Sequence, residues 1–412
     1  MKFIEELKWR GLVKDVTDDE GLKKHLETSR VVYCGFDPTA SSLHIGHLQQ
    51  LILLLRYSLA GHKPIVLIGG VTGMIGDPRP TTERSLQSLE VIENNVLSLS
   101  KQIKGIVGQH CIIENNANWL LSLSMVNLLR DYGKYFNISQ MIARDIISSR
   151  LSKGISFTEF TYTILQAIDW LELFKRYNCS VQIGGSDQWG NLLSGYELMR
   201  KMPELSAEVF GITSPLITKA DGSKFGKSEG ENIWLDPQLT SPYTFYQYWV
   251  NSSDADIESW LKKLSLKSVE FIQQLIEEHN QAPHLRKAQK HLAAELTELV
   301  FGIEGLNSAI RITEALFNSD FVSLSAGELE LAFKDATIIN INADYNLVDL
   351  LVDNSLISSK REARQLITSG SILVNNIKVD DGGFIISKAN AIENKFSIIR
   401  KGKKTYYLVK HV

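Results

Sequence analysis

The chain has 412 residues, of which 44% are hydrophobic and 22% are charged. A chain of this length exceeds one typical domain, so we expect two or three compact units, each with its own core. The sequence has no apolar run of the ~20 residues that a membrane span needs, and its N-terminus mixes charged and apolar side chains, unlike a signal peptide. Three widely spaced cysteines without a CxxC pattern argue against disulfides or a cysteine zinc site. These features predict a cytoplasmic protein that does not act at a membrane.

The first part of the chain predicts alternating strands and helices. Residues 30–36 (RVVYCGF) and 65–68 are short, continuously apolar runs, which is typical of parallel strands buried on both faces. A helical pattern lies between them at 44–59, and further strands are expected at 105–114 and 179–183. The pattern favours an α/β fold with a doubly wound parallel sheet of the Rossmann type. In such folds, ligands lie at the carboxyl ends of the strands.

Changes in sequence character divide the chain into four parts. Residues 1–230 carry the α/β pattern, whereas helical periodicity dominates and glycine becomes scarce in 231–320. The signal is weak in 321–343, which we interpret as a linker. Residues 344–412 predict two short helices followed by hairpin strands, a small α+β domain.

Charge is distributed unevenly along the chain, although the net formal charge is only −3. Residues 355–412 hold eleven Lys and Arg residues against four Asp and Glu residues. This tail therefore carries seven net positive charges, and the rest of the chain carries ten net negative ones. An acidic body with a basic end is expected when one module meets a polyanion.

Two histidines, His44 and His47, stand at the start of the first predicted helix. A zinc pair is one interpretation, but zincin histidines are spaced i, i+4 and need a third ligand, which no local cluster supplies. Capping or packing at a helix start is the second, and for an isolated pair it is the better one. The third is phosphate binding, because a helix N-terminus offers unpaired N–H groups beside the imidazole donors. Gly46 would then let part of a nucleotide approach the backbone.

A second element, DGSKFGKSEG at 221–230, places Lys224 and Lys227 in a loop of glycines and serines. Alone, such a loop is more often a solvated surface loop. Together with HIGH at 44–47, the KMSKS-like residues 224–228 resemble the paired signatures of class I aminoacyl-tRNA synthetases. The resemblance implies that an amino acid attacks the α-phosphorus of ATP. That reaction depends on positioning and on stabilising the charge that grows on the phosphate oxygens.

The resemblance extends over essentially the whole chain. It is to bacterial tyrosyl-tRNA synthetases, and it is carried in order by YCGFDPTASSLHIGH, GGVTGMIGDP, GISFTEFTYTILQAIDW, QIGGSDQWGN, TKADGSKFGKS and SPYTFYQYW. It implies a ligase that makes tyrosyl-adenylate and pyrophosphate from L-tyrosine and ATP, and then transfers tyrosine to the 3′-terminal adenosine of tRNA(Tyr). It also implies Mg²⁺ that accompanies ATP without a protein-bound metal, and a homodimer.

The helix predicted around residues 159–177 carries a polar stripe that periodicity alone does not explain. At 100° per residue, Tyr162, Gln166 and Asp169 fall on one narrow polar stripe. From the spacing alone, a solvated face is an equally good interpretation. The resemblance places the stripe in a tyrosine pocket, where Tyr162 and Gln166 join Asp77 at the α-ammonium group. Asp169 and Tyr33 would then hydrogen-bond the phenol.

The resemblance assigns the other site residues as well. The catalytic set is Thr39, His44, His47, Lys224 and Lys227, and the tyrosine side gains Gln182 and Gln188. The ATP side comprises Gly35, Asp37, His44, Gly46, His47, Gly184, Asp187, Lys224, Lys227 and Ser228. Asp187 is expected at a ribose hydroxyl, although from the residues alone the glycines before it could equally mark a tight turn.

The basic tail resembles a small RNA-binding domain first described in a ribosomal protein. The segment SKREARQL places Lys360 and Arg364 one helical turn apart. We expect RNA rather than DNA as the partner, with contacts from Lys360, Arg361, Arg364, Lys401, Lys403 and Lys404. Basic surfaces bind phosphate backbones largely without sequence preference. A charged face kept for solubility is the alternative interpretation.

Two other functions stay open at this point. A different HIGH-type enzyme, either a nucleotidyltransferase or the sister tryptophanyl-tRNA synthetase, would not need the pair of Tyr33 and Asp169. A non-enzymatic RNA-binding or splicing protein on the same fold would bind RNA without activating an amino acid.

Overall fold

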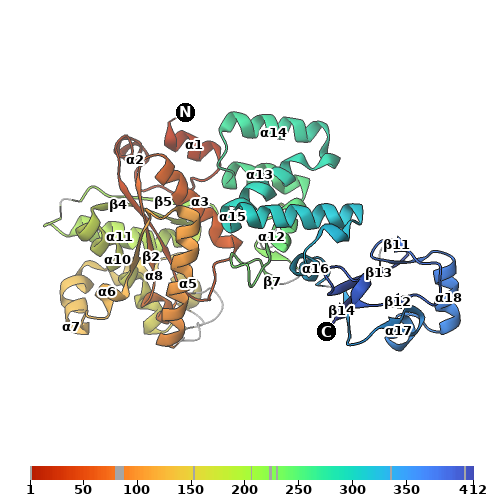
Figure 1. The fold of residues 1–412 in the computed structure, drawn as a ribbon. Coiled ribbons are helices and arrows are strands. Elements are labelled where there is room, and N and C mark those ends of the chain that lie inside the picture. Colours follow the sequence, from red (N-terminus) through yellow and green to blue (C-terminus); the bar gives the residue numbers. More distant parts are fainter. Residues whose placement is uncertain are drawn as a thin grey trace. The chain divides into compact units, whose positions relative to one another are not determined.

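The computed structural model describes residues 2–78, 88–151, 154–205, 207–221, 225–228, 231–334, 336–402 and 405–412. The chain forms two compact units. One comprises Met1–Thr240 and Tyr248–Val300, and the other comprises Ser241–Gln247 and Phe301–Val412. Figure 1 labels the helices and strands of both units. Among the described helices, none combines the length and the hydrophobicity needed to cross a lipid bilayer.

A five-stranded parallel sheet forms the centre of the first unit (Figure 1). Its order is β3-β2-β1-β4-β5. The strands are β1 (Val31–Phe36), β2 (Lys63–Ile68), β3 (Ile112–Asn115), β4 (Cys179–Gly185) and β5 (Phe210–Ser214). All four pairings are parallel, and β4 is buried along its whole length, as expected for a strand covered on both faces. The predicted doubly wound α/β fold is confirmed.

The chain changes direction across this sheet at β1. It builds outward from β1 through β2 to β3, returns, and continues on the other side through β4 to β5. The loops that follow β1 and β4 therefore diverge at the carboxyl edge of the sheet. Open α/β sheets bind their ligands at such a switch point.

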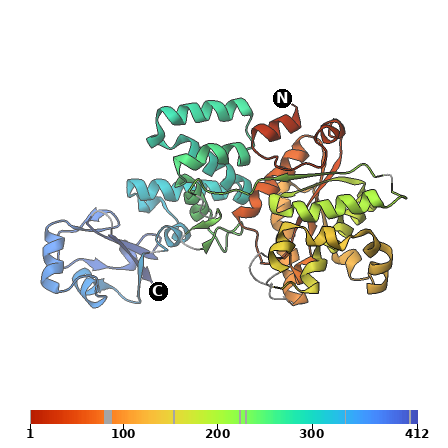
Figure 2. The ribbon, with the colours of Figure 1, turned by 180° about the vertical axis from the view of Figure 1, so that it is seen from behind.

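Helices cover both faces of the sheet. α3 (Ile45–Leu59) and α5 (Leu89–Val107) pack against each other and against β2, in front of the sheet in Figure 1. α10 (Phe157–Tyr177) and α11 (Trp189–Lys201) pack against each other and against β4, nearer the viewer in Figure 2. The shorter helices are α1 (Phe3–Trp9), α2 (Asp19–His25), α4 (Thr72–Ile75), α6 (Ala117–Leu120), α7 (Met125–Asn127), α8 (Ile138–Ile142) and α9 (Asp145–Leu151).

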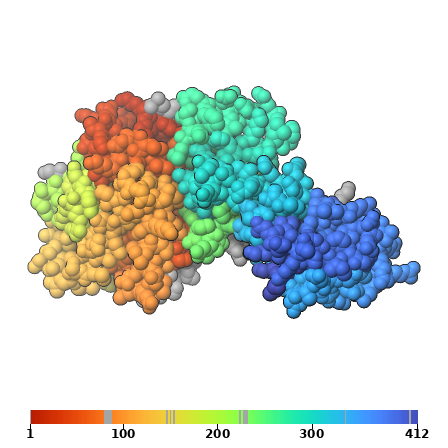
Figure 3. Space-filling view, viewed as in Figure 1, coloured from red at the N-terminus to blue at the C-terminus, as the bar shows by residue number. Residues whose placement is uncertain are grey.

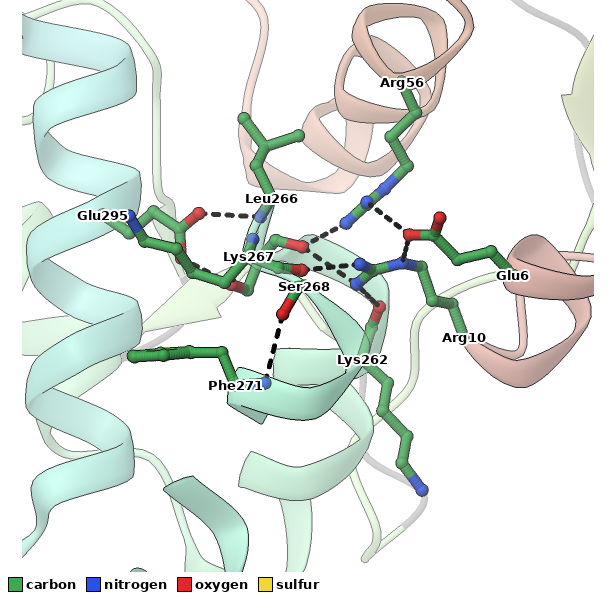
Figure 4. A network of polar contacts seen from close by, with 10 residues as sticks. Glu6, Arg10, Arg56, Lys262, Leu266, Lys267, Ser268, Phe271 and Glu295 are labelled. Atoms are coloured by element: carbon green, nitrogen blue, oxygen red, sulfur yellow. Dashed lines mark hydrogen bonds and ion pairs between the residues drawn. The ribbon is translucent and has the colours of Figure 1, made fainter. Parts of the chain in front are cut away.

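A buried polar network joins this α/β body to the helical part of the first unit (Figure 4). That part contains α13 (Asp254–Leu264), α14 (Val269–Gln281), the end of α12 (Pro242–Val250) and the first part of α15 (Lys287–Asn318), since the division between the two units falls within α12 and within α15. Arg10 is 1% exposed and donates to Glu6 and to three carbonyl oxygens at the end of α13 and in the loop after it. Arg56, from the last turn of α3, donates to one of them, that of Ser265. Glu295 on α15 accepts from the same loop, so the network ties α1, α3 and α15 to one loop.

The second unit contains a mixed sheet in the order β11-β10-β13-β14-β8. The strands of this sheet are β8 (Thr337–Ile341), β10 (Ile372–Val374), β11 (Ile377–Lys378), β13 (Phe396–Lys401) and β14 (Thr405–His411). β9 (Tyr345–Asn346) and β12 (Ile385–Ile386) form a separate pair in this unit, whereas β6 (Lys227–Ser228) and β7 (Glu231–Asn232) form a pair in the first unit. Alternate residues of β14 enter different cores, as the two faces of a strand require. Val409 packs with α17 (Leu347–Asp353) and α18 (Lys360–Thr368), and Leu408 packs with α16 (Ala326–Ala332) and the end of α15.

Two segments differ from what the sequence predicted. The strand expected at 105–114 starts too early, because residues 105–107 are the end of α5, Gly108 (φ 109) caps that helix, and β3 begins only at Ile112. The linker expected at 321–343 contains α16 and the edge strand β8, which pairs with β14. β8 was missed because three of its five residues are exposed, so it lacks a continuous apolar run. The other domain boundaries stay predictions.

Candidate active site

A pocket of about 330 Å³ opens at the carboxyl edge of the parallel sheet. It is bounded by the end of β1 and the loop after it, by the start of α3, by the loop after β2, by α10 and by the end of β4. This is the switch point between β1 and β4, where the fold favours a ligand.

The pocket brings together most of the residues that the sequence nominated. Those that line it are Tyr33, Gly35, Asp37, Thr39, His44, Gly46, His47, Asp77, Tyr162, Gln166, Asp169, Gln182, Gly184, Asp187 and Gln188. Lys224 lies outside the described residues, as do the side chains of Lys227 and Ser228. In the second unit, Lys360, Arg361 and Arg364 are exposed on α18 or at its start, Lys401 donates to the carbonyl oxygen of Leu356, and Lys403 and Lys404 lie outside the described residues.

The two histidines cap α3 in a reciprocal arrangement. Nδ1 of His44 accepts from the backbone N–H of Gly46 at 3.0 Å, and Nδ1 of His47 accepts from the backbone N–H of His44 at 3.2 Å. Because an accepting Nδ1 carries no hydrogen, each neutral ring holds its hydrogen on Nε2. Burial, assisted by the charge of His44, lowers the pKa of His47 to about 3. His47 is therefore a neutral N–H donor at physiological pH, and capping and ligand binding are compatible roles.

Gly46 serves the histidine arrangement itself. A Cβ on Gly46 would lie 2.7 Å from Cε1 and 2.9 Å from Nδ1 of His44. A side chain at this position would therefore displace the capping ring. The sequence-based reason for this glycine was access for a nucleotide, and the structure supplies a local one.

Directly after the KMSKS-like residues 224–228, the chain runs alongside the start of α3. The backbone N–H of Ile45 donates to the carbonyl oxygen of Ile233, and the N–H of Leu235 donates to the carbonyl oxygen of Leu43. Gly226 lies against this segment, since a Cβ there would be 3.8 Å from the backbone nitrogen of Gly46. β6 and β7 pair as a short antiparallel ribbon immediately afterwards. The backbone of the KMSKS-like segment thus runs beside the HIGH segment.

Asp77 is held at the pocket by two side-chain amides. Gln188 donates to Oδ2 of Asp77 at 2.8 Å, and Asn191 donates to Oδ1 at 3.0 Å. Burial raises the pKa of Asp77 to about 6, although both hydrogen bonds act in the opposite direction. A partly desolvated carboxylate with neutral partners is suited to a cationic ligand group.

Asp169 is more deeply buried, at 2% exposure. Trp119 donates from Nε1 to Oδ1 of Asp169 at 2.8 Å, and Asn116 donates from Nδ2 to Oδ2 at 3.0 Å. Burial raises the pKa of Asp169 to about 7 in spite of these bonds. Each carboxylate oxygen keeps further lone pairs that can accept a hydrogen from a ligand.

Four more polar atoms at the pocket have no partner in the described part of the chain. They are the hydroxyl oxygen of Tyr33 and the Oε1 atoms of Gln49, Gln50 and Gln166. Burial, with the charge of Asp169 as a further cause, raises the pKa of Tyr33 well above its usual value. Buried polar atoms usually find a partner in the protein or in a ligand. Tyr33 and Asp169 together offer a donor and an acceptor to a hydroxyl group.

The charge of the pocket is one-sided. Its lining includes four aspartates, and none of the lining residues in the described part of the chain is Lys or Arg. Within the described residues, no group of three or more His, Cys, Asp or Glu side chains is arranged to hold a metal ion. A polyanionic ligand would therefore need cations from another source.

Sequence reasoning missed the residues that hold the carboxylates of the pocket, which are Thr72, Asn116, Trp119 and Asn191. Thr72 and Asn191 lie within the segments GGVTGMIGDP and QIGGSDQWGN but were given no role, and Asn116 and Trp119 lie in none of the recognised segments. A signal for Asn116 existed, because it directly follows the carboxyl end of β3. The strand was expected a few residues too early, so this position was not recognised as lying at the edge of the sheet.

Comparisons with known proteins agree with this geometry. Residues 25–318 match the family described as tRNA synthetases class I (W and Y), and residues 328–409 match the tyrosine–tRNA ligase SYY-like C-terminal domain. The chain is 49% identical over 417 residues to a tyrosine–tRNA ligase of Staphylococcus carnosus, covering 100% of this chain and 99% of that protein.

Solved structures give the same picture. A C-terminally truncated mitochondrial tyrosyl-tRNA synthetase of Aspergillus nidulans superposes with a TM-score of 0.69 at 32% identity, covering 77% of this chain and 94% of that one. A tryptophanyl-tRNA synthetase of Plasmodium falciparum shares the fold with a TM-score of 0.55 at 17% identity, covering 80% of this chain and 87% of that one.

Proposed function

The chain belongs to the class I tRNA synthetases of the W and Y family, and we propose that the pocket between β1 and β4 is where it joins L-tyrosine to ATP. Its function is that of a tyrosine–tRNA ligase. Tyrosine and ATP give tyrosyl-adenylate and pyrophosphate, and the tyrosyl group then passes to the 3′-terminal adenosine of tRNA(Tyr).

The observation that carries the choice of tyrosine is the pair of Asp169 and Tyr33. Asp169 is a buried carboxylate fixed by Trp119 and Asn116, and the hydroxyl of Tyr33 has no partner among the described residues. A phenol hydroxyl would donate to Asp169 and accept from Tyr33. Phenylalanine would leave the buried hydroxyl of Tyr33 unpaired and Asp169 with only its two protein donors, and a buried polar group left without a partner costs about 1–3 kcal/mol. Selectivity then needs no editing step.

The α-ammonium group of tyrosine is assigned to a second carboxylate of the pocket, that of Asp77, and to two neighbouring side chains. Asp77, Tyr162 and Gln166 are the proposed partners, and Oε1 of Gln166 is a buried acceptor without a partner in the described chain. The four aspartates that line the pocket favour a cation at this position. Gln182 and Gln188 complete the tyrosine side.

ATP is assigned to the side formed by the HIGH segment and the end of β4. Nε2–H groups of His44 and His47, with Thr39, are the proposed donors to phosphate and ribose oxygens, and Asp187 is the proposed acceptor for a ribose hydroxyl. Gly35, Asp37, Gly46 and Gly184 form the remaining wall. Because no described lining residue is a lysine or arginine, positive charge is assigned to Lys224 and Lys227 and to Mg²⁺ held mainly by the phosphates.

Exchange of labelled pyrophosphate into ATP tests this function. We expect exchange that depends on tyrosine and does not occur with tryptophan. Exchange driven by tryptophan would contradict the amino-acid assignment. RNA binding without exchange for any amino acid would support a non-enzymatic protein instead.

We assign the C-terminal unit to tRNA(Tyr) and the protein to the cytoplasm. Arg361 and Arg364 are exposed on α18, beside Lys360, which pairs with Asp349 at 2.8 Å. Replacing both arginines with Glu should lower tRNA charging at least ~10-fold and leave pyrophosphate exchange unchanged, because phosphate contacts add to affinity one by one. Lys388→Glu is the matched control. An equal effect of the control would contradict a role specific to α18.

We also assign a homodimer to the chain. Residues 121–138 of the first unit form part of the outer surface in Figure 3. This segment carries five large apolar side chains that are each more than half exposed: Leu121, Met125, Val126, Leu129 and Ile138. Exposed apolar patches of this kind mark association sites, and a second copy is the expected occupant. Replacing Met125 and Val126 with Asp should give a monomer by analytical ultracentrifugation, whereas Leu59→Asp should not. A native monomer at micromolar concentration would refute the assignment.

A further inference from the structure

A chain of hydrogen bonds connects Asp169, at the proposed phenol site, to Asp37, on the ATP side of the pocket. Asn116 donates from Nδ2 to Oδ2 of Asp169 at 3.0 Å and to Oγ1 of Thr72 at 2.9 Å. Thr72 then donates from Oγ1 to Oδ1 of Asp37 at 2.9 Å. Only two side chains therefore separate the two carboxylates.

The direction of every bond in this chain is fixed. Oδ1 of Asn116 accepts from the backbone N–H of Val71 at 2.8 Å, so the amide nitrogen must face the other way. Its two hydrogens are used by Asp169 and Thr72, and the amide has no further donor. Thr72 receives one of them, so its single hydroxyl hydrogen is directed to Asp37. Asn116 is 0% exposed and Thr72 is 3% exposed, so water does not compete for these bonds.

The Asp37 end of the chain is held tightly. Tyr162 donates from its hydroxyl to Oδ2 of Asp37 at 2.9 Å. Gly69 packs beneath the contact, since a Cβ there would lie 2.2 Å from both Oδ1 of Asp37 and Oγ1 of Thr72. A glycine is therefore required for the carboxylate and the hydroxyl to meet.

We propose that Thr72 and Asn116 are positioning residues that couple recognition of the substrate phenol at Asp169 to the placement of Asp37 beside the reacting groups. The inference rests on the proposed function. A phenol hydroxyl that donates to Asp169 fixes this carboxylate, which orients the amide of Asn116. That amide in turn commits the hydroxyl of Thr72 to Asp37. Phenylalanine supplies no such donor, so Asp169 is held by Trp119 and Asn116 alone and the chain is not strengthened. Hydrogen-bond networks act cooperatively in this way.

A thermodynamic cycle of two substrates and two enzymes tests the coupling. Thr72→Val removes the hydroxyl at nearly constant volume, and kcat/KM is measured by pyrophosphate exchange with tyrosine and with phenylalanine. With tyrosine we expect a loss of roughly 10-fold, in the range for residues that share one hydrogen-bond network. With phenylalanine we expect little change, so the ratio between the substrates falls by a similar factor. Thr72→Ser keeps the hydroxyl and should restore both values to within about 3-fold of native.

Each other result has a definite meaning. An equal loss with both substrates would overturn the coupling, because Thr72 would then only support the fold. Native behaviour of Thr72→Val would overturn it as well. If that variant does not fold by circular dichroism, Thr72→Ala removes the same hydroxyl without placing an extra methyl group against Asp37, and the same ratio is measured. A native enzyme without tyrosine-dependent exchange would instead refute the proposed function, so the two failures are distinguishable.

Discussion

Replacing Asp169 with Asn should abolish tyrosine selectivity and, at neutral pH, make the protein more stable. Burial raises the pKa of Asp169 from 3.8 to about 7. The folded state therefore binds a proton at this site that the unfolded state has already lost. Stability contributed by the site falls as pH rises from about 4 to about 7, and it is constant above that. An amide does not ionise, so the variant lacks this dependence.

The magnitude follows from the size of the shift. Each pH unit corresponds to about 1.4 kcal/mol, so the native protein is destabilised by roughly 4 kcal/mol above pH 7 relative to an ordinary carboxyl group. Against this, the amide N–H₂ must face one of the two donors, Trp119 or Asn116, which costs about 1–3 kcal/mol. The gain dominates at pH 8, and the two effects nearly cancel at pH 5.

Melting temperatures of the native protein and of Asp169→Asn, measured from pH 5 to pH 8, give the assay. The difference should grow in favour of the variant up to about pH 7 and then level off. The exposed Glu204→Gln is the control and should show no such trend. A difference in melting temperature that does not vary with pH would refute the reasoning, because it would mean that burial of the ionised Asp169 does not destabilise the folded protein. Loss of tyrosine-dependent exchange in the variant is expected throughout.

Three further results are expected. In Gly69→Ala the new Cβ would lie 2.2 Å from Asp37 and from Thr72, so tyrosine-dependent exchange should fall roughly 10-fold or more. Gly105→Ala is the control, because a Cβ there meets nothing within 4 Å, and it should keep native exchange. Equal activities of the two variants would contradict the close packing at Gly69. Burial raises the pKa of Cys34 to about 12, so alkylation by iodoacetamide at pH 8, followed by mass spectrometry, should be on the order of 10³-fold slower than for a free thiol; labelling at an ordinary rate would show an exposed thiolate. Arg10→Met leaves the carbonyl oxygens of Lys262 and Lys267 without this donor, while that of Ser265 keeps Arg56. The change should cost about 3–5 kcal/mol, seen as a lower melting temperature than for the exposed control Lys24→Met. Similar melting temperatures would mean that the network of Figure 4 adds little.

The sequence predicted the structure best where a pattern of residue types is typical of a single kind of element or site. Continuous apolar runs identified β1 and β2, and the helix after β1 was placed to within one residue of α3. Motifs then identified the pocket side chains, because ligand-facing groups must be of particular chemical types. β8 was missed because its alternation of exposed and buried residues resembles that of a loop over so short a length.

The residues that hold the site could not be predicted in this way. Asn116 and Thr72 are ordinary amide and hydroxyl side chains, and their value comes from which carboxylates they reach. That depends on the register of β1 against β2 and on the turn after β3, which a single sequence does not fix. The contact of Gly46 with His44 was not predicted for a similar reason, since only coordinates reveal that the ring of His44 folds over it.

The carboxylates of the pocket are held in a way that leaves the charge of Asp77 for the substrate ammonium group and lone pairs of Asp169 for the substrate phenol. In the described structure, the side-chain donors to Asp77 are amides and those to Asp169 are an amide and an indole. A guanidinium in their place would cancel the charge and compete with the substrate ammonium group. Neutral donors orient the carboxylates without neutralising them, which is why burial still raises the pKa of Asp77 to about 6 and that of Asp169 to about 7. The resulting instability is relieved only when a ligand supplies the missing partners, so tyrosine should stabilise the first unit by about 2.7 kcal/mol at 100 times its Kd.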